Sequence, residues 1–471
     1  MNDTDDATSD ASTANERAGD DAPPGDSVAV GLADHALPLG TTRPDADRGV
    51  FGPFDDAIAD AEVVGLGEAT HGTREFFELK HRLVRWLAAE HDLGAFVMEA
   101  NLPEARTVDE YVVHGRGDPA AALADVYFWT WQVQAVRDLL AWLRAYNADR
   151  PLGDRVRVYG VDAQYARGAV AALSDQFETV APEVLTDCRD DLAVVDAGGE
   201  PMHQDDDLGA RVAAAERLLP RLREHLTERR GEHVATTDER AWEQACRDVT
   251  VLEQCTDLRR AWADRRRAAD ALDGDDSGDL PAQFVERTLR VRDRAMADNA
   301  AWVADRVDGP VALWAHDAHL NRLEQRSRHT GATATSLGGH LADRYGDGYY
   351  ALGFAFGRGE FRALGPDGDG GSERRPVAVE APLEGTVEAM LDRVAGDDGR
   401  LPAGPFALDL RTAGADDRLG EWLATPREHL SAGATFDPAA PTEYLRSYEY
   451  AAAFDGLCYV PETTASRPLP E

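Results

Sequence analysis

The chain of 471 residues contains almost no lysine: Lys80 is the only one, and all other side chains in the lysine and arginine total are arginine. Acidic residues number 87 against 49 lysine and arginine residues, which gives a formal net charge of −38. This excess repels nucleic acid phosphates and anionic lipid surfaces, so we predict no nucleic acid or membrane partner. Because the carboxylates are spread along the chain, the composition resembles that of proteins from salt-loving organisms, where dense salt screens self-repulsion.

Long apolar runs are also missing, and none approaches the ~18 residues needed to cross a bilayer. The N-terminal stretch lacks the basic start and apolar middle of a secretory signal, so we expect a cytoplasmic protein. The four cysteines, Cys188, Cys246, Cys255 and Cys458, contain no C-x-x-C pair. We therefore expect buried free thiols and neither a disulfide framework nor a zinc site.

Several catalytic motifs are absent from the chain. There is no Gly-x-Ser-x-Gly nucleophile elbow, no phosphate-binding loop of the Gly-Lys-Ser/Thr kind, and no Gly-x-Gly-x-x-Gly after a strand. These absences count against a serine hydrolase, a nucleotidase and a dehydrogenase.

The remaining pattern predicts an α/β fold with a mostly parallel central sheet flanked by helices. Residues 1–45 have almost no apolar periodicity, and we expect them to form a disordered acidic tail ahead of one domain over 46–471. Apolar runs predict buried strands at 61–67, 95–99, 156–162, 310–316, 349–356 and 456–460. Helical spacing predicts helices at 51–60, 74–90 and 133–146.

Long charged helical stretches interrupt this alternation of strands and helices. They lie at about 208–230, 239–268 and 282–307, with a break rich in Asp and Gly at 273–280. We interpret residues from about 168 to 307 as a helical insertion that forms a lid or wall over a pocket. A later segment rich in Gly, Asp and Glu, residues 357–375, is expected to be an exposed turn or mobile loop.

The first candidate site is the motif Gly67-Glu68-Ala69-Thr70-His71-Gly72, where a predicted strand gives way to a helix. Strand ends of this kind build the sites of α/β proteins, and the flanking glycines let the chain turn tightly. A carboxylate at Glu68 would orient the imidazole of His71 and raise its basicity, as a general base requires. The alternative is a helix-capping turn with a surface histidine.

Two further strand ends carry groups that could share the same crevice. His316 and His319 follow the strand at 310–316, and such a pair could bind a metal, donate to an oxyanion or shuttle a proton. Glu99 ends the strand at 95–99, and its alternative role is a structural acid paired with a buried arginine.

Additional candidates lie on neighbouring segments. Either Arg292 or Arg294 could point into the site from its helix, and the spacing alone does not decide between them. We also predict substrate-binding roles for Lys80, Asp162, Trp129 and Trp131. Lys80 could instead cap a helix or lie along the surface, and tryptophans at this spacing usually pack in a core.

With these residues in place, the chain resembles the erythromycin esterase family. The matching segments cover nearly everything after the tail: Val63–Pro103, Phe128–Asn147, Val158–Gln164, Arg292–Asn299, Val311–Arg322 and Phe454–Pro470. The resemblance implies hydrolysis that opens macrolide lactone rings, with no required metal or cofactor, through a histidine that deprotonates water.

The resemblance also implies roles for individual residues. By position in the motifs, His71 is the base, Glu68 and Glu99 are its acidic partners, and the pair at 316 and 319 lines the same pocket. It selects Arg292 as the site arginine, and Lys80 falls where the family places a basic residue.

We therefore predict a hydrolase of a small-molecule ester or lactone that uses water activated by His71, without a covalent intermediate. One alternative is a metal-dependent hydrolase, since His71, His316, His319 and Glu99 are acceptable ligands for zinc or manganese. The other is a non-catalytic protein that binds a small molecule in the same pocket. The missing H-E-x-x-H pattern counts against the metal, and the sequence leaves substrate, strand order and oligomeric state open.

Overall fold

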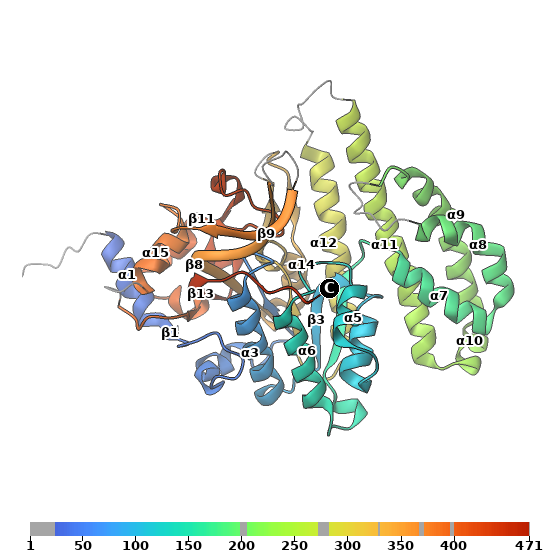
Figure 1. Ribbon diagram of the computed structural model, residues 1–471, viewed down its shortest axis with the longest axis horizontal. Coiled ribbons are helices and arrows are strands. Elements are labelled where there is room, and N and C mark those ends of the chain that lie inside the picture. The colour runs from blue at the N-terminus through green and yellow to red at the C-terminus, as the bar shows by residue number, and fades with distance from the viewer. Residues whose placement is uncertain are drawn as a thin grey trace, which may run out of the picture.

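Nine strands form one twisted sheet with helices on both faces, as the computed structural model shows for residues 24–197, 205–271, 282–327, 330–366, 372–395 and 400–470 (Figure 1). The strand order is β1-β10-β13-β8-β2-β5-β3-β4, and β9 pairs with the outer part of β8. The strands from β13 to β4 in this order are mutually parallel, while β1, β10 and β9 pair antiparallel. The predicted fold class, a mostly parallel sheet flanked by helices, is confirmed.

The strands of the sheet are β1 (Ala36–Pro38), β2 (Val63–Leu66), β3 (Ala95–Asn101), β4 (Arg157–Asp162), β5 (Val311–Trp314), β8 (Tyr349–Pro366), β9 (Ser372–Val379), β10 (Phe406–Asp409) and β13 (Gly456–Thr463). Two small hairpins stand apart from it, β6 (Glu324–Arg326) with β7 (Thr333–Thr335) and β11 (Arg427–Leu430) with β12 (Leu445–Tyr448). Every residue of β2, β3 and β5 is buried, as expected for parallel strands covered on both faces.

Helices cover the sheet through two separate hydrophobic cores. One face carries α2 (Asp55–Ile58), α3 (Arg74–Glu90), α4 (Arg106–Asp109), α5 (Pro119–Asp125) and α6 (Gln134–Asn147). The other carries α12 (Ala282–Ala304), α14 (Leu337–Tyr345), α15 (Val387–Ala395) and the short α13 (Asp317–Leu320), α16 (Leu410–Ala413), α17 (Gly420–Ala424) and α18 (Tyr450–Ala453). The apolar residues of α3 recur at helical spacing, which explains why this helix buries one side against the sheet.

The helices between β4 and β5 lie where the sequence predicts the insertion. They are α7 (Arg167–Val180), α8 (Pro182–Asp196), α9 (Leu208–Glu228), α10 (Arg230–Thr236), α11 (Glu239–Asp270) and α12. Helices α7 to α11 pack around a core of their own and form the lobe on the right of Figure 1. Among the described helices of the insertion, α12 packs along β4 and forms a wall of the site, and the other helices stand beside it.

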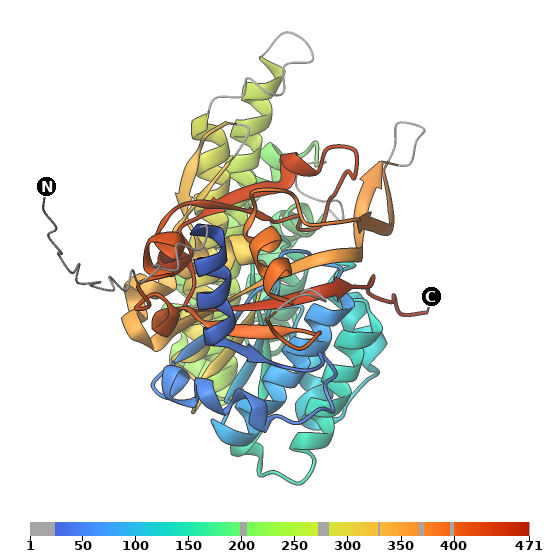
Figure 2. The ribbon, with the colours of Figure 1, turned by 90° about the vertical axis from the view of Figure 1, so that its left-hand side faces the viewer.

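Two expectations about irregular segments are wrong. The predicted tail is folded from residue 24 onward: α1 (Pro24–His35) packs against α15, more than 350 residues away (Figure 2), and β1 adds a strand to the sheet. Leu32 is fully buried there, so a few well-placed apolar residues outweigh the polar composition. The remainder of the tail, residues 1–23, lies outside the described residues, as does the break at 273–280.

The segment at 357–375 is also more ordered than predicted. Strand β8 continues to Pro366 and pairs with β9, and Phe361 and Ala363 are buried on one side of this hairpin. The alternation of apolar and polar residues in this stretch is typical of a strand, but its many glycines favour the prediction of a loop. Residues 367–371 lie outside the described part of the chain.

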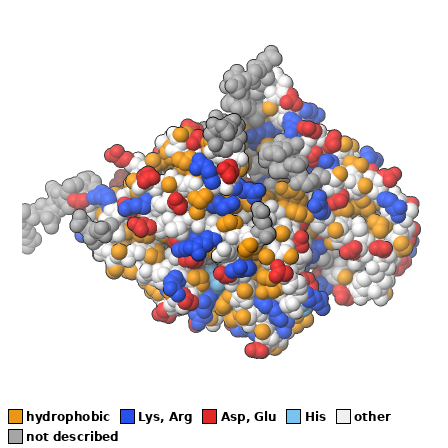
Figure 3. Space-filling model, in the orientation of Figure 1, with side chains coloured by type: hydrophobic (Ala, Val, Ile, Leu, Met, Phe, Trp, Pro, Cys, Tyr) orange, Lys and Arg blue, Asp and Glu red, His pale blue; other side chains and the backbone are white. Residues whose placement is uncertain are grey.

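The remaining expectations concern cysteines and the surface. All four cysteines are free; three are buried and Cys246 is half-buried. In the described ranges, no helix is both long and apolar enough to span a bilayer. Arginines and acidic side chains are interspersed over the face shown in Figure 3, so local ion pairing accompanies the negative net charge.

A substitution at Gly72 tests how closely the loop after β2 packs against β8. A Cβ atom at this position would lie 1.9 Å from the backbone oxygen of Arg362, whose amide donates to the Gly72 carbonyl at 3.0 Å. Because backbone must move to make room, we expect Gly72→Ala to lower the free energy of unfolding by about 1–3 kcal/mol. Gly209→Ala on α9, where nothing lies within 4 Å, is the control and should be neutral or stabilising. Urea unfolding of both variants measures this, and equal stabilities would contradict the close approach.

Candidate active site

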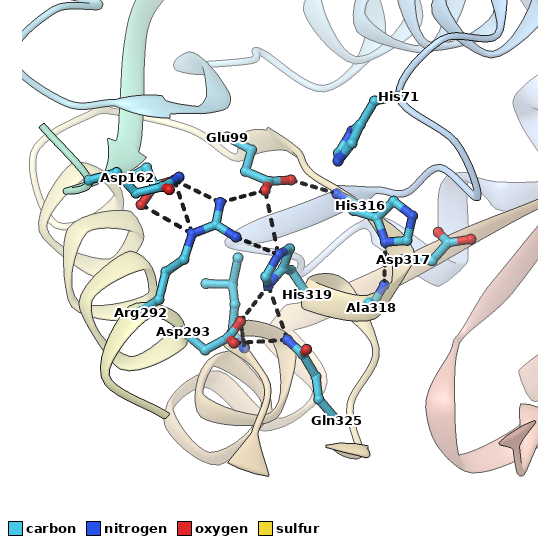
Figure 4. Close-up of polar contacts among 12 residues, drawn as sticks. His71, Glu99, Asp162, Arg292, Asp293, His316, Asp317, Ala318, His319 and Gln325 are labelled. Atoms are coloured by element: carbon cyan, nitrogen blue, oxygen red, sulfur yellow. Dashed lines mark hydrogen bonds and ion pairs between the residues drawn. The ribbon is translucent and has the colours of Figure 1, made fainter. Parts of the chain in front are cut away.

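Four neighbouring strand ends bring the predicted residues together. Strands β2, β5, β3 and β4 lie side by side and parallel, so their carboxyl ends meet at one edge of the sheet. Figure 4 shows the resulting cluster, in which α12 contributes Arg292 and Asp293 at the same edge. The predicted members that the structure brings together are Glu68, His71, Glu99, Asp162, Arg292, His316 and His319.

Glu68 and His71 form a tight pair on the loop after β2. His71 Nδ1 lies 2.6 Å from Glu68 Oε1, so the ring donates its Nδ1 proton to the carboxylate and leaves Nε2 free to accept one. Burial lowers the pKa of His71, but the hydrogen bond and negative charge of Glu68 outweigh it and leave the pKa above its ordinary value. The His71 side chain is 17% exposed, so its free nitrogen can meet a solvent molecule.

Lys80 lies behind Glu68 and is fully buried. Its Nζ donates to Glu68 Oε2 at 2.6 Å, and Trp314 Nε1 donates to the same oxygen at 2.8 Å. The ammonium group also lies 4.3 Å from the centre of the Trp314 ring. Burial lowers the pKa of Lys80 to about 8, although Glu68 opposes the shift. Burial raises the pKa of Glu68, but Lys80 and His71 outweigh it, so Glu68 stays ionised.

Glu99 occupies the centre of the site. Its Oε1 accepts from Arg292 Nη2 at 2.7 Å and lies 3.4 Å from His319 Nε2, and its Oε2 accepts from the His316 backbone amide at 2.9 Å. Burial raises the pKa of Glu99, but the neighbouring His319 imidazole and Arg292 guanidinium outweigh it and hold the pKa well below its usual range. Glu99 is therefore a permanent carboxylate, unsuited to act as a general acid near neutral pH.

Arg292 is the arginine that faces the site, whereas Arg294 is exposed and pairs with Asp298 on the same helix. Besides Glu99, Arg292 donates to Asp162 through both Nε and Nη2, and its Nη1 lies 3.0 Å from His319 Nε2. The other N–H of Nη1 has no partner among the described residues. This side chain is 23% exposed, so that N–H is available to a ligand.

His319 has a carboxylate partner of its own. Its Nδ1 lies 2.6 Å from Asp293 Oδ1 on α12, and Gln325 Nε2 donates to the other oxygen of Asp293 at 2.8 Å. His319 Nδ1 therefore donates a hydrogen bond to Asp293, and His319 Nε2 accepts one from Arg292. The ring is fixed on both sides in this arrangement.

His316 has both ring nitrogens occupied by backbone. Its Nδ1 accepts from the Ala318 amide at 3.1 Å, and its Nε2 donates to the Ala69 carbonyl at 3.2 Å. Burial, followed by the nearby charge of His71, lowers its pKa well below the ordinary value. The His71 and His316 rings lie 5.0 Å apart. Because this neutral imidazole bonds the Ala69 carbonyl, it holds the loop that carries His71.

The two predicted tryptophans lie in different environments. Trp131 is 3% exposed, packs against Trp314 and donates to the Glu99 carbonyl at 3.3 Å, so it supports the site from the core. Trp129 is half-buried on the loop before α6, and its predicted contact with a substrate remains a prediction.

Sequence reasoning missed three supporting residues. Asp293 lies on a predicted helix and Trp314 within a predicted strand. Neither follows a predicted strand, as the candidate residues Glu68, His316 and His319 do. His429 comes from β11 and lies 2.8 Å from Glu388 Oε1 and 3.5 Å from Asp317 Oδ2. Burial lowers the pKa of His429, but Glu388 and Asp317 outweigh it and raise the pKa to about 9. No local sequence signal marks this buried charge.

The donor arrangement does not fit a metal ion. The nitrogens of His316 are both taken by backbone, and Nε2 of His319 faces the positive guanidinium of Arg292. Across the ranges that the structure describes, no group of three or more His, Cys, Asp or Glu side chains has a geometry suited to a metal. Of the three histidines, His71 is therefore the one whose Nε2 is not already bonded by a described residue.

Lys80→Met tests the buried ion pair behind the loop that carries His71. Removing the cation leaves the Glu68 carboxylate buried without its counterion, so we expect the free energy of unfolding to fall by roughly 3–5 kcal/mol. Arg294→Met, which removes a surface cation paired with Asp298, should cost less than about 1 kcal/mol. Urea unfolding at neutral pH measures both. Equal losses for the two variants would show that Lys80 contributes no more than a surface charge.

Comparisons with known proteins identify relatives that match most of the chain. A family model described as erythromycin esterase matches residues 88–463. The chain is 23% identical to the erythromycin esterase type II of Escherichia coli, covering 76% of this chain and 84% of that protein. It is 20% identical to the putative hydrolase YbfO of Bacillus subtilis strain 168, with 78% of each chain covered.

Solved structures show the same fold. A Bacillus cereus protein aligns with a TM-score of 0.77 at 23% identity, covering 95% of this chain and 99% of that one. An erythromycin esterase mutant in its open conformation aligns with a TM-score of 0.63 at 18% identity, covering 90% and 96%. Because the family model spans well over half of the sequence, the chain belongs to the erythromycin esterase family.

Proposed function

We propose that the protein hydrolyses a carboxylic ester or lactone by activating water with His71, without a covalent intermediate. The observation that carries the proposal is the pair of Glu68 and His71, in which the carboxylate fixes Nδ1 as a donor and frees Nε2. The names of the erythromycin esterase and hydrolase relatives support the same reaction class. Macrolide lactones therefore belong among the candidate substrates.

In the proposed reaction, His71 Nε2 takes a proton from water while the oxygen attacks the carbonyl carbon. The tetrahedral intermediate then collapses with cleavage of the carbon–oxygen bond, and the leaving alkoxide takes the proton back from His71. The products are an alcohol and a carboxylic acid, which releases its proton to solvent and becomes a carboxylate. In a lactone both groups remain in one opened molecule. Glu68 and Glu99 stabilise the imidazolium that exists between these steps, since Glu68 bonds it and the charge of Glu99 acts on it.

Arg292 supplies the proposed stabilisation of the intermediate. The free N–H of Nη1 donates to the oxyanion, and the bonds to Asp162, Glu99 and His319 keep the guanidinium in place before substrate arrives. Asp162 and Lys80, predicted as substrate-binding residues, are then positioning residues for Arg292 and Glu68. His316 positions the loop of His71 in the same way.

Replacement of the proposed base gives the most direct test. His71→Asn keeps a similar size without an imidazole, so we expect kcat to fall by about 10²–10⁴-fold on a panel of aryl esters, lactones and a macrolide. His91→Asn removes a histidine that also pairs with a carboxylate, at 2.9 Å from Asp55, but lies outside the site, and should leave kcat unchanged. Unchanged turnover in the His71 variant, or an acyl adduct in the intact mass during turnover, would overturn the mechanism.

The pH dependence of the reaction tests the role of Glu68. His71 must be neutral to act as a base, so kcat/KM should fall as the pH drops through a pKa above the ordinary 6.5. In Glu68→Gln the opposing carboxylate is gone, and burial together with the Lys80 charge lowers the pKa of His71. The acid limb should then move to lower pH while the maximal rate falls. An acid limb that stays in place would mean that another group controls the reaction.

A further inference from the structure

A cleft lies at the opposite edge of the sheet from the candidate active site. It has a volume of about 760 Å³ and opens between the amino ends of β3 and β4 and the helical insertion. One wall comes from the loop before β4 and the end of α6, and the other from the start of α11 and the end of α12. A space of this size is typical of sites for small molecules.

Arginine is concentrated in this cleft. The side chains of Arg150, Arg155 and Arg157 line the sheet wall, and those of Arg240 and Arg306 line the insertion wall. The carboxylates that line the cleft are Asp92, Asp154, Glu243 and Asp308. Acidic residues outnumber lysine and arginine by 87 to 49 over the whole chain, whereas five arginines and four carboxylates line the cleft. One of the five, Arg157, is neutralised by Asp109.

Two of these arginines are half-buried and have no carboxylate partner among the described residues. Arg150 Nη2 donates to the Tyr146 hydroxyl at 2.5 Å, and its guanidinium lies 4.0 Å from the centre of that ring. Arg155 donates to the carbonyls of Arg150 and Val113 at 3.0 and 2.5 Å. These contacts fix both side chains without neutralising them, which leaves positive charge in a partly enclosed space.

The opposite wall adds positive charge from the insertion. Arg306 lies over the Trp302 ring at 4.4 Å, and its only carboxylate neighbour among the described residues is Glu243 at 3.9 Å. Arg240 is exposed and close enough to lower the pKa of the Tyr159 hydroxyl, which burial raises. A ligand between the walls would thus meet guanidinium groups from both the sheet and the insertion.

We propose that this cleft is a binding site for a small anion bearing phosphate groups, separate from the site of hydrolysis. Guanidinium groups donate pairs of N–H bonds to phosphate oxygens, and converging groups from two walls suit a ligand with more than one charge. The guanidinium groups of Arg306 and Arg247 already lie over the Trp302 ring, at 4.4 and 5.3 Å from its centre, so the ligand would be recognised by its charge. The bound anion would bridge the insertion and the sheet, at the amino end of β4 and the carboxyl end of α12.

Calorimetric titration with pyrophosphate at a fixed chloride concentration tests the proposal, with inorganic phosphate and citrate as comparison ligands. We expect pyrophosphate to bind at one site per chain and more tightly than phosphate or citrate. Arg240→Gln should raise its Kd by about tenfold, since an exposed side chain that donates to the ligand is lost without harm to the fold. Combining it with Arg155→Gln should raise the Kd further.

Arg217→Gln provides the matched control, because it removes an exposed arginine of α9 that pairs with Asp191 outside the cleft. This variant should bind pyrophosphate like the parent protein, and the cleft variants should hydrolyse esters like the parent. The proposal is overturned if pyrophosphate shows no binding, if Arg217→Gln and Arg240→Gln weaken binding equally, or if citrate binds more tightly. None of these outcomes affects the proposed hydrolysis, which His71→Asn tests separately.

Discussion

The burial of an ionised Glu68 is the constraint on which the site depends. Taking a carboxylate out of water costs several kcal/mol unless its oxygens are fully bonded by positive or polar groups. Here one oxygen bonds Lys80 from α3 and Trp314 from β5, and the other bonds His71. The packing of α3 against the sheet therefore keeps Lys80 beside Glu68, and this keeps Glu68 ionised and bonded to His71. The fold and the proposed chemistry thus depend on the same ion pair.

The single lysine is intelligible in the same terms. The abundant acidic and arginine side chains lie mainly at the surface of the protein, where they contact solvent. Lys80, in contrast, is fully buried. Its compact ammonium group fits between Glu68 and the faces of Trp314 and Phe354, with ring centres at 4.3 and 5.3 Å. A planar guanidinium would need a wider space and more acceptors than this position offers.

The sequence could predict what depends on local pattern. The helix at 74–90 and the strands before Glu68, Glu99 and His316 follow from apolar periodicity, and a parallel sheet then places those residues at one edge. Long-range packing decided the rest. The rotation of α12 about its own axis, where it packs on β4, turns Arg292 toward the site and Arg294 away from it. The same rotation brings Asp293 to His319. The folding of α1 depends on α15, which no local window contains.

The three histidines of the site differ in hydrogen bonding because their partners differ. His316 is bonded to backbone at both nitrogens, and His319 lies between Asp293 and Arg292, so neither has a free nitrogen for water. His71 alone among them combines an anionic partner with an unoccupied nitrogen. When it takes a proton, its charge further disfavours protonation of His316 at 5.0 Å, while Glu99 remains ionised nearby. One proton can thus enter the cluster at a defined position, which is the property that general base catalysis requires.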